Sequence, residues 1–140
     1  MIKLALSKYG VKEVPGEKNN PEILKFFYDI GHTWVQSEDT AWCSAFVNWV
    51  AKKSGNEYSG KLNARSWLDV GEPIEGFHDI GDVVILWRED PLSWKGHVGL
   101  FIRETKSSIY VLGGNQDNRV CIKPYPRARL LGYRRLQKKL

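Results

Sequence analysis

The sequence predicts an α+β protein in which N-terminal helices pack on a C-terminal antiparallel β-sheet. Apolar residues recur at helical spacing in the first half, whereas from Asp82 onward they form short strand-like runs. Glycine, proline, asparagine and serine separate these runs, which is typical of strands joined by turns. Because the helices precede the strands rather than alternating with them, the order of elements favours α+β.

Length and composition predict one domain over residues 1–140, since 42% of the residues are hydrophobic and no repeat or long linker interrupts them. No apolar stretch approaches the roughly 20 residues of a membrane span. The N-terminal apolar run breaks at Ser7 and Lys8, too early for a signal-peptide core. We therefore expect synthesis in the cytoplasm without a signal peptide, and no membrane span.

Two helices are expected before residue 35. The first follows from apolar residues at helical spacing that end before a glycine: Ile2, Ala5, Leu6 and Tyr9, then Gly10. In the second, Asn20 can cap the N-terminus, Pro21 suits the first turn and Glu22 complements the helix dipole. Its apolar residues and its terminal glycine are Ile23, Leu24, Phe27, Ile30 and Gly31.

A third helix is expected to begin near Asp39 or Thr40 and to run to Gly55. Its broad apolar face comprises Trp42, Ala45, Phe46, Trp49 and Val50. The polar stripe of this helix comprises Ser44, Asn48 and Lys52. A short helix over residues 63–70 should follow. Strands are then expected over residues 82–87, 97–103, 108–112, 119–123 and 130–134.

The formal charge of +5 is concentrated in the last 14 residues, RARLLGYRRLQKKL, which hold six basic residues and no acid. Without those six the charge falls to −1. The stretch is typical of a solvated edge strand and tail, and attraction to a polyanion is the alternative. Because no basic helix or RNA-binding aromatic motif accompanies these charges, we expect no nucleic-acid partner.

Cysteine chemistry points to one residue. Two cysteines in a chain without a signal peptide do not favour a disulfide, and His32, His78 and His97 are too scattered for a zinc site. No metal or other cofactor is therefore expected. Cys43 falls in the first turn of the third helix, where the dipole and unpaired N–H groups favour a thiolate. The alternative for Cys43 is a small buried apolar residue.

His97 opens the strand that continues into a hairpin with residues 108–112. If Glu104 pairs with Ser108, His97 lies directly opposite Asn115 on the same face. An asparagine amide beside an imidazole can orient a general base for a thiol. Asn115 follows two glycines, so a turn role is the alternative.

Cysteine, histidine and asparagine thus occur in the order that papain-like enzymes use. The sequence resembles the papain-like cell-wall hydrolases of the CHAP and NlpC-type families, and most closely a small group of phage- and prophage-associated bacterial proteins. The matching stretches are NPEILKFF, TAWCSAFVNWV, ARSWL, GDVVILWR, GHVGLF, LGGNQDNRV and YPRARLLGYR. The resemblance covers nearly the whole chain and implies a papain-like fold, with Cys43, His97 and Asn115 as catalytic residues.

The resemblance also implies peptidoglycan as the substrate, cut at an amide within or beside the stem peptide. Papain has a glutamine upstream of its cysteine as an oxyanion donor, but this sequence shows no secure counterpart: Gln36 lies seven residues upstream of Cys43, and a loop position is its alternative. The N–H of Cys43 is therefore the preferred donor. Candidate substrate contacts are Trp94, Gln116 and Trp42. The alternative for Trp42 and Trp94 is a position in the hydrophobic core, and the alternative for Gln116 is an ordinary turn position.

The function predicted from these observations is a cysteine-dependent peptidoglycan amidase or endopeptidase, acting as a phage or prophage lysin or as a secreted antibacterial effector. Its expected partners are peptidoglycan and, for an effector, an immunity protein or export machinery, and we expect a monomer. Two alternatives remain open from the sequence. One is a catalytically silent wall-binding or structural module, and the other is an acyltransferase or deamidase that acts on protein.

Overall fold

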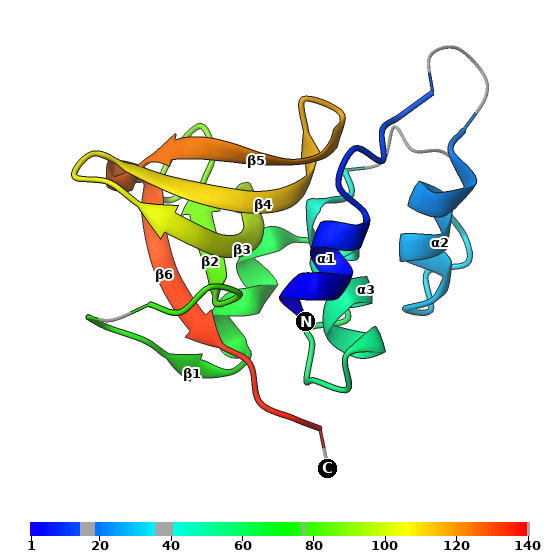
Figure 1. Cartoon of the computed structure of the whole chain (residues 1–140), viewed down its shortest axis with the longest axis horizontal. Coiled ribbons are helices and arrows are strands. Elements are labelled where there is room, and N and C mark those ends of the chain that lie inside the picture. Colours follow the sequence, from blue (N-terminus) through cyan, green and yellow to red (C-terminus); the bar gives the residue numbers. More distant parts are fainter. Residues whose placement is uncertain (15–18, 36–40, 77, 140) are drawn as a thin grey trace.

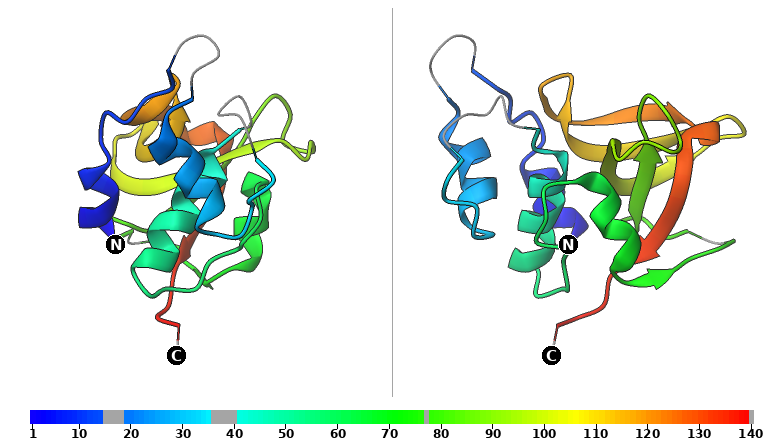
Figure 2. Two further views of the ribbon diagram at one scale, coloured as in Figure 1. Left: turned by 90° about the vertical axis from the view of Figure 1, so that its right-hand side faces the viewer. Right: turned by 180° about the vertical axis from the view of Figure 1, so that it is seen from behind.

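The computed structural model describes residues 1–14, 19–35, 41–76 and 78–139. It has helices and one antiparallel sheet, which confirms the predicted α+β class. In the described part of the chain the sheet has six strands in the order β1-β6-β2-β3-β4-β5. Helices α1, α2 and α3 lie to one side of this sheet, and α3 lies between the sheet and α2 (Figures 1 and 2).

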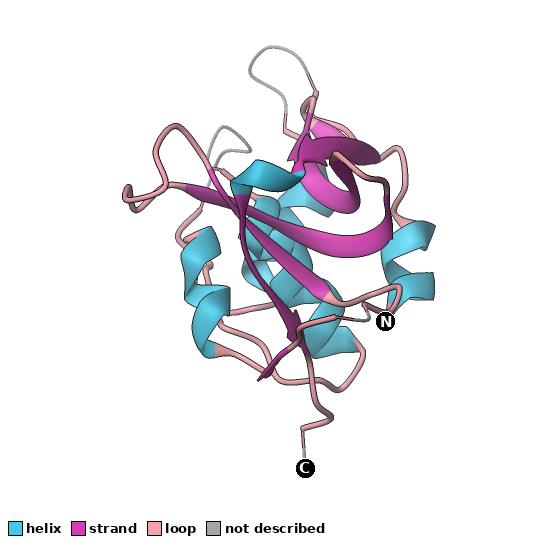
Figure 3. Cartoon of the chain, turned by 90° about the vertical axis from the view of Figure 1, so that its left-hand side faces the viewer, coloured by secondary structure: helices cyan, strands magenta, loops and turns pink. Residues whose placement is uncertain are grey.

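The helices are α1 (Ile2–Ser7), α2 (Pro21–Tyr28) and α3 (Cys43–Lys53), with short 3₁₀ helices η1 (Ala64–Asp69) and η2 (Arg127–Arg129). The strands are β1 (Glu72–Pro73), β2 (Val83–Trp87), β3 (Gly96–Glu104), β4 (Ser108–Gln116), β5 (Arg119–Pro126) and β6 (Leu130–Arg135). The sequence did not predict β1, because two residues are too few to show an alternating pattern. Figure 3 shows how the strands and helices are distributed.

The start of α2 forms as its sequence predicts. The side chain of Asn20 accepts a hydrogen bond from the backbone N–H of Glu22, at 2.9 Å, and Pro21 occupies the first turn. The helix then buries Ile23, Phe26 and Phe27 against the rest of the core. Phe26 contacts the ring of Trp49 from α3, with the ring centroids 5.1 Å apart.

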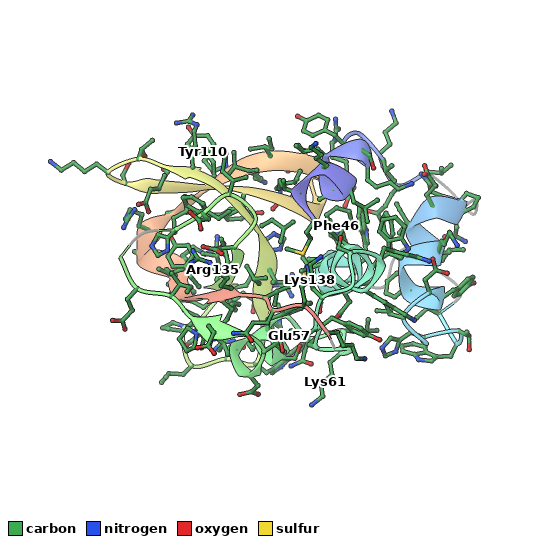
Figure 4. All side chains as sticks on the ribbon, turned by 60° about the horizontal axis from the view of Figure 1, so that its bottom comes forward. Phe46, Glu57, Lys61, Tyr110, Arg135 and Lys138 are labelled. Carbon is green, nitrogen blue, oxygen red and sulfur yellow. The ribbon has the colours of Figure 1, made fainter. Side chains whose placement is uncertain are left out.

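Helix α3 is buried along most of its length and joins the helices to the sheet. Phe46 is fully buried where α3 meets the sheet (Figure 4). The predicted caps, Asp39 and Thr40, lie outside the described residues. In the structure the helix begins at Cys43, and Trp42 is its N-cap residue without a side-chain capping hydrogen bond.

The polar stripe predicted on α3 was expected to face solvent, and this is wrong for two of its three residues. Ser44 and Asn48 are fully buried, and both bind the segment that follows the helix. Ser44 Oγ donates to Lys61 O at 2.6 Å, and Asn48 Oδ1 accepts from Gly60 N at 2.8 Å. Buried polar groups are stable when they are hydrogen-bonded in this way, and a helical period cannot reveal such partners from a distant loop.

The hairpin of β3 and β4 follows the predicted register only in its middle. Leu100 pairs with Leu112 as predicted, but Glu104 pairs with Ile109 rather than Ser108 because the register shifts between Phe101 and Arg103. A second irregularity lies in β4 between Gly113 and Gln116. There Asn115 has a left-handed backbone with a φ of 59°, so this part of β4 does not alternate regularly.

The basic C-terminal stretch is not a solvated edge strand, because β6 lies between β1 and β2. Its guanidinium groups bind the surrounding structure. Arg129 Nε donates to Trp87 O, Arg134 Nε donates to Leu68 O, and Arg135 binds both carboxylate oxygens of Asp82. Part of the chain's positive charge therefore stabilises the fold.

Candidate active site

Cys43 and His97 come together at one pocket. Cys43 is the first residue of α3, and His97 lies near the start of β3. Both side chains are buried, with 8% and 9% of their surfaces exposed, and both line a pocket of about 110 Å³. The remaining lining residues are Ala41, Leu62, Asn63, Ala64, Arg88, Trp94, Gly96 and Asn115. Cys43 and His97, two of the three residues predicted to be catalytic, thus line the same pocket although they lie far apart in the sequence, and the third, Asn115, lines it as well.

The thiol of Cys43 differs electrostatically from the sequence-based expectation. Burial raises the pKa of Cys43 above the ordinary value of a thiol. The backbone of Val98 and Ser44 and the charge of Arg88 act in the opposite direction, but more weakly. The predicted resting thiolate is therefore wrong for this structure, because the sequence shows the helix N-terminus but not the burial that opposes it.

The hydrogen-bond partner of His97 is Gln116 and not Asn115. The Nε2 atom of His97 lies 2.8 Å from Oε1 of Gln116, and this contact is buried. The predicted hydrogen bond between His97 and Asn115 is wrong: after the irregularity in β4, Gln116 is the residue that binds His97, whereas Asn115 lines the same pocket and binds the backbone of Trp42. A side-chain amide does bind the imidazole, as predicted, but it belongs to Gln116, one position after Asn115.

The surroundings of Gln116 fix which atom it presents to His97. Its Nε2 donates to Val111 O at 3.2 Å and to Cys121 O at 2.7 Å. Since carbonyls only accept hydrogen bonds, the amide nitrogen must face them and the amide oxygen must face His97. An oxygen acceptor requires the proton on Nε2 of a neutral imidazole. Nδ1 is then the unprotonated nitrogen, which is the form that a general base needs.

Asn115 has a different structural task. Its Oδ1 accepts a hydrogen bond from the backbone N–H of Trp42 at 2.9 Å. Trp42 directly precedes Cys43, so this contact holds the start of α3 against β4 and thereby positions the thiol. Asn115 also lines the pocket.

Close packing explains the two glycines of the GGNQ stretch. A Cβ on Gly113 would lie 2.5 Å from Oε1 of Gln116 and 3.4 Å from Nε2 of His97. A Cβ on Gly114 would lie 2.6 Å from the ring of Trp42. The contacts at 2.5 and 2.6 Å are too short for real atoms, so each glycine makes room for a neighbour that defines the site.

Burial also controls the charge of His97. It lowers the pKa of His97 to about 4, since the interior disfavours the imidazolium. The hydrogen bond to Gln116 raises this pKa, whereas the charges of Arg129 and Arg88 lower it. The ring also packs against Tyr125, with the centroids 5.1 Å apart. At neutral pH the resting site thus holds a thiol and a neutral imidazole.

The loop between β2 and β3 forms one side of the pocket. Three hydrogen bonds from the guanidinium of Arg65 hold it, to the carbonyl oxygens of Asp90, Pro91 and Lys95. This loop presents Trp94, whose side chain is 72% exposed and lines the pocket. Trp94 therefore remains a candidate substrate contact, and its alternative as a core residue is wrong.

The other two candidate substrate contacts are wrong for this structure. Trp42 is fully buried in the core and Gln116 is 2% exposed, so neither side chain is accessible to a substrate. Sequence reasoning missed Arg88 and Arg65, although Arg88 ends the stretch GDVVILWR and Arg65 lies in the stretch ARSWL. Gln36 lies outside the described residues. Cys43 and Cys121 form no disulfide.

Other features of the described residues do not resemble a second catalytic site. A wider hollow of about 520 Å³ lies over β1 and β6 and includes His78, but it contains no cysteine or serine. No group of three acidic, cysteine or histidine side chains in residues 1–14, 19–35, 41–76 and 78–139 is arranged to hold a metal ion. Among the same residues, no helix has the length and apolar character of a membrane span.

The sequence matches no protein-family model, and no curated protein sequence matches it. The resemblance to CHAP and NlpC-type hydrolases therefore stays a prediction based on the motifs of the chain.

Proposed function

We propose that the protein is a cysteine-dependent amidohydrolase in which Cys43 is the nucleophile, His97 the general base and acid, and Gln116 the residue that positions His97. The observation that carries the proposal is the buried amide of Gln116, which holds its oxygen 2.8 Å from Nε2 of His97. The tautomer fixed in this way leaves Nδ1 unprotonated, as a general base requires, in a histidine that lines the same pocket as Cys43.

The proposed reaction is acyl transfer. His97 Nδ1 takes the proton of the Cys43 thiol as sulfur attacks the amide carbonyl, and the oxyanion forms near the N–H of Cys43. That N–H has no partner within the helix because Cys43 is the first residue of α3. His97 then protonates the leaving amine, and afterwards it deprotonates a water molecule that hydrolyses the thioester and regenerates the thiol.

We further propose a papain-like arrangement of the fold and peptidoglycan as the substrate. A cysteine at a helix start facing a sheet that carries the histidine supports the first part. The sequence motifs support the second part, including the bond class, an amide within or beside the stem peptide. The exposed Trp94 beside the pocket gives a flat apolar surface suited to a sugar ring or a peptide.

The experiment is to incubate purified sacculi with the wild-type protein, with Cys43→Ala and with Cys121→Ala, and to identify the released ends by mass spectrometry. We expect new amino or lactyl ends from the wild type and from Cys121→Ala, because Cys121 does not line the pocket and the oxygen that binds the amide of Gln116 at 2.7 Å belongs to its backbone, which alanine keeps. We expect none from Cys43→Ala. Equal products from Cys43→Ala would exclude Cys43 as the nucleophile.

The same site chemistry fits an acyltransferase or deamidase that acts on protein, because both would use the same acyl-enzyme intermediate. Measuring ammonia release from glutamine-containing proteins separates this alternative from cell-wall hydrolysis. A silent module is disfavoured by the accessible pocket beside Cys43 and His97.

A further inference from the structure

Arg88 is an exposed residue that directly follows β2, at the margin of the active-site pocket. Residue Leu86 of the same strand pairs with His97, so the end of β2 lies beside the reacting groups. Burial is the largest cause of the pKa shifts of Cys43 and His97. The positive charge of Arg88 is a further cause, and it lowers the pKa of both residues. The guanidinium is therefore close enough to act on any charge that enters the pocket.

Among the described residues, the guanidinium of Arg88 forms no ion pair or hydrogen bond with a carboxylate, and its charge acts on Glu89 only from beyond salt-bridge distance. Within the described part of the chain this side chain makes neither a hydrogen bond nor an ion pair, whereas those of Arg65, Arg129 and Arg135 are all engaged. The two acidic residues that follow Arg88 have other contacts. Glu89 binds Lys95 Nζ at 2.9 Å, and Asp90 accepts a hydrogen bond from the backbone N–H of Leu92.

The position of Arg88 is also supported by a fixed loop. The hydrogen bonds of Arg65 to three loop carbonyls and the ion pair of Glu89 with Lys95 hold both ends of the segment that joins β2 to β3. A planar guanidinium with free N–H groups binds a carboxylate through two parallel hydrogen bonds. An unpaired guanidinium in a preorganised loop beside a nucleophile is thus suited to a negatively charged substrate.

We propose that Arg88 is a specificity-determining residue that binds a carboxylate of the substrate next to the scissile amide. This proposal rests on the proposed amide hydrolysis and narrows its substrate class to peptides with a free carboxylate beside the cleaved bond. Stem peptides of peptidoglycan offer such carboxylates. Trp94, on the same loop, would contact the neighbouring uncharged part of the substrate.

The first test needs no substrate, and it compares alkylation of Cys43 by anionic iodoacetate and by neutral iodoacetamide. Peptide mapping by mass spectrometry counts modification at Cys43 alone, in the wild type, in Arg88→Gln and in the control Arg103→Gln. Arg103 is exposed, stacks on Tyr110 (labelled in Figure 4) and does not line the pocket, so the control removes the same charge elsewhere.

We expect Arg88→Gln to lower the ratio of iodoacetate to iodoacetamide rates by about threefold to tenfold at low salt, as one charge at short range predicts. High salt should shrink the difference, and Arg103→Gln should leave the ratio unchanged. The ratio cancels any general change in thiol reactivity. An unchanged ratio in Arg88→Gln overturns the proposal, and so does failure of both reagents to reach Cys43, because the proposed carboxylate must enter the same pocket.

The second test uses two muropeptides that differ only in whether the carboxyl group beside the scissile amide is free or amidated. Arg88→Gln should raise KM for the free acid about 10-fold to 100-fold, in the range of a charged hydrogen-bonded pair, and should change KM for the amide little. Arg88→Lys should restore part of the loss. Equal effects on both muropeptides would refute carboxylate binding. Cleavage of neither by the wild type would refute the hydrolase, and the alkylation ratio would then decide whether Arg88 attracts an anion.

Discussion

Replacing Gln116 by leucine tests the positioning of His97 most directly. Leucine keeps the approximate size of the side chain but removes three hydrogen bonds: two buried ones, to Nε2 of His97 and to Val111 O, and a partly buried one to Cys121 O. A buried group that loses its partner costs about 1–3 kcal/mol, and relaxation of the two carbonyls offsets part of the sum, so we expect a loss of about 2–4 kcal/mol in the free energy of unfolding.

The expected catalytic effect has a separate cause. Without the oxygen acceptor, the proton of the neutral imidazole is no longer held on Nε2 and can occupy Nδ1, which blocks the base. General acid–base catalysis contributes about 10²-fold to 10⁴-fold, so we expect kcat/KM to fall by about 100-fold or more. The acid limb of the pH profile should also move to lower pH, since the hydrogen bond to Gln116 raises the pKa of His97.

Asn115→Ala is the matched control, because Asn115 binds the backbone of Trp42 and not His97. We expect it to cost about 1 kcal/mol, as the loss of a helix-capping hydrogen bond does, and to leave the acid limb in place. The assays are urea unfolding and kcat/KM against pH on the muropeptide that the wild type cleaves. The reasoning is refuted if Gln116→Leu keeps wild-type activity and Asn115→Ala displaces the acid limb.

Three further predictions concern the pH response, the packing of the site and the ion pair of β6. His97 has a pKa of about 4 in the folded protein and about 6.5 in the unfolded chain, so the free energy of unfolding should fall as the pH drops from 6.5 to 4. His97→Gln removes this titration. Urea unfolding at neutral pH and at pH 4 should therefore show that the variant loses about 3 kcal/mol less unfolding free energy than the wild type does. Gly113→Ala should displace the amide oxygen of Gln116, because the new Cβ would lie 2.5 Å from it. We expect kcat/KM to fall about 10-fold to 100-fold while the near-ultraviolet circular dichroism spectrum stays native. A fully active variant would contradict this packing. Asp82→Asn should cost about 1–3 kcal/mol in urea unfolding because the buried carboxylate binds Arg135 through both oxygens, and a neutral effect would show that the pair does not stabilise the fold.

Elements with strong local signals could be predicted from the sequence. The cap of α2 by Asn20, the stop of α1 before Gly10 and the main strands follow from side chains that act on their own backbone or repeat at a fixed period. The same reasoning placed Cys43 at a helix start and His97 on a strand, because both depend on neighbours within a few residues.

Contacts between distant segments could not be predicted in the same way. Counting residues along a regular hairpin gave Asn115 as the partner of His97, but the irregularity after Gly113 moved Gln116 into that place. The buried Ser44 and Asn48 likewise depend on Lys61 and Gly60, which helical periodicity does not include.

The sequence by itself determined the α+β class and the chemical types of the residues at the site, since local propensity and periodicity are properties of neighbouring residues. Only the tertiary structure decided that Gln116 rather than Asn115 holds His97, that burial raises the pKa of Cys43, and that the guanidinium of Arg88 is left without a partner among the described residues. Register, desolvation and ion pairing each depend on atoms brought together from far along the chain, and folding alone fixes their distances.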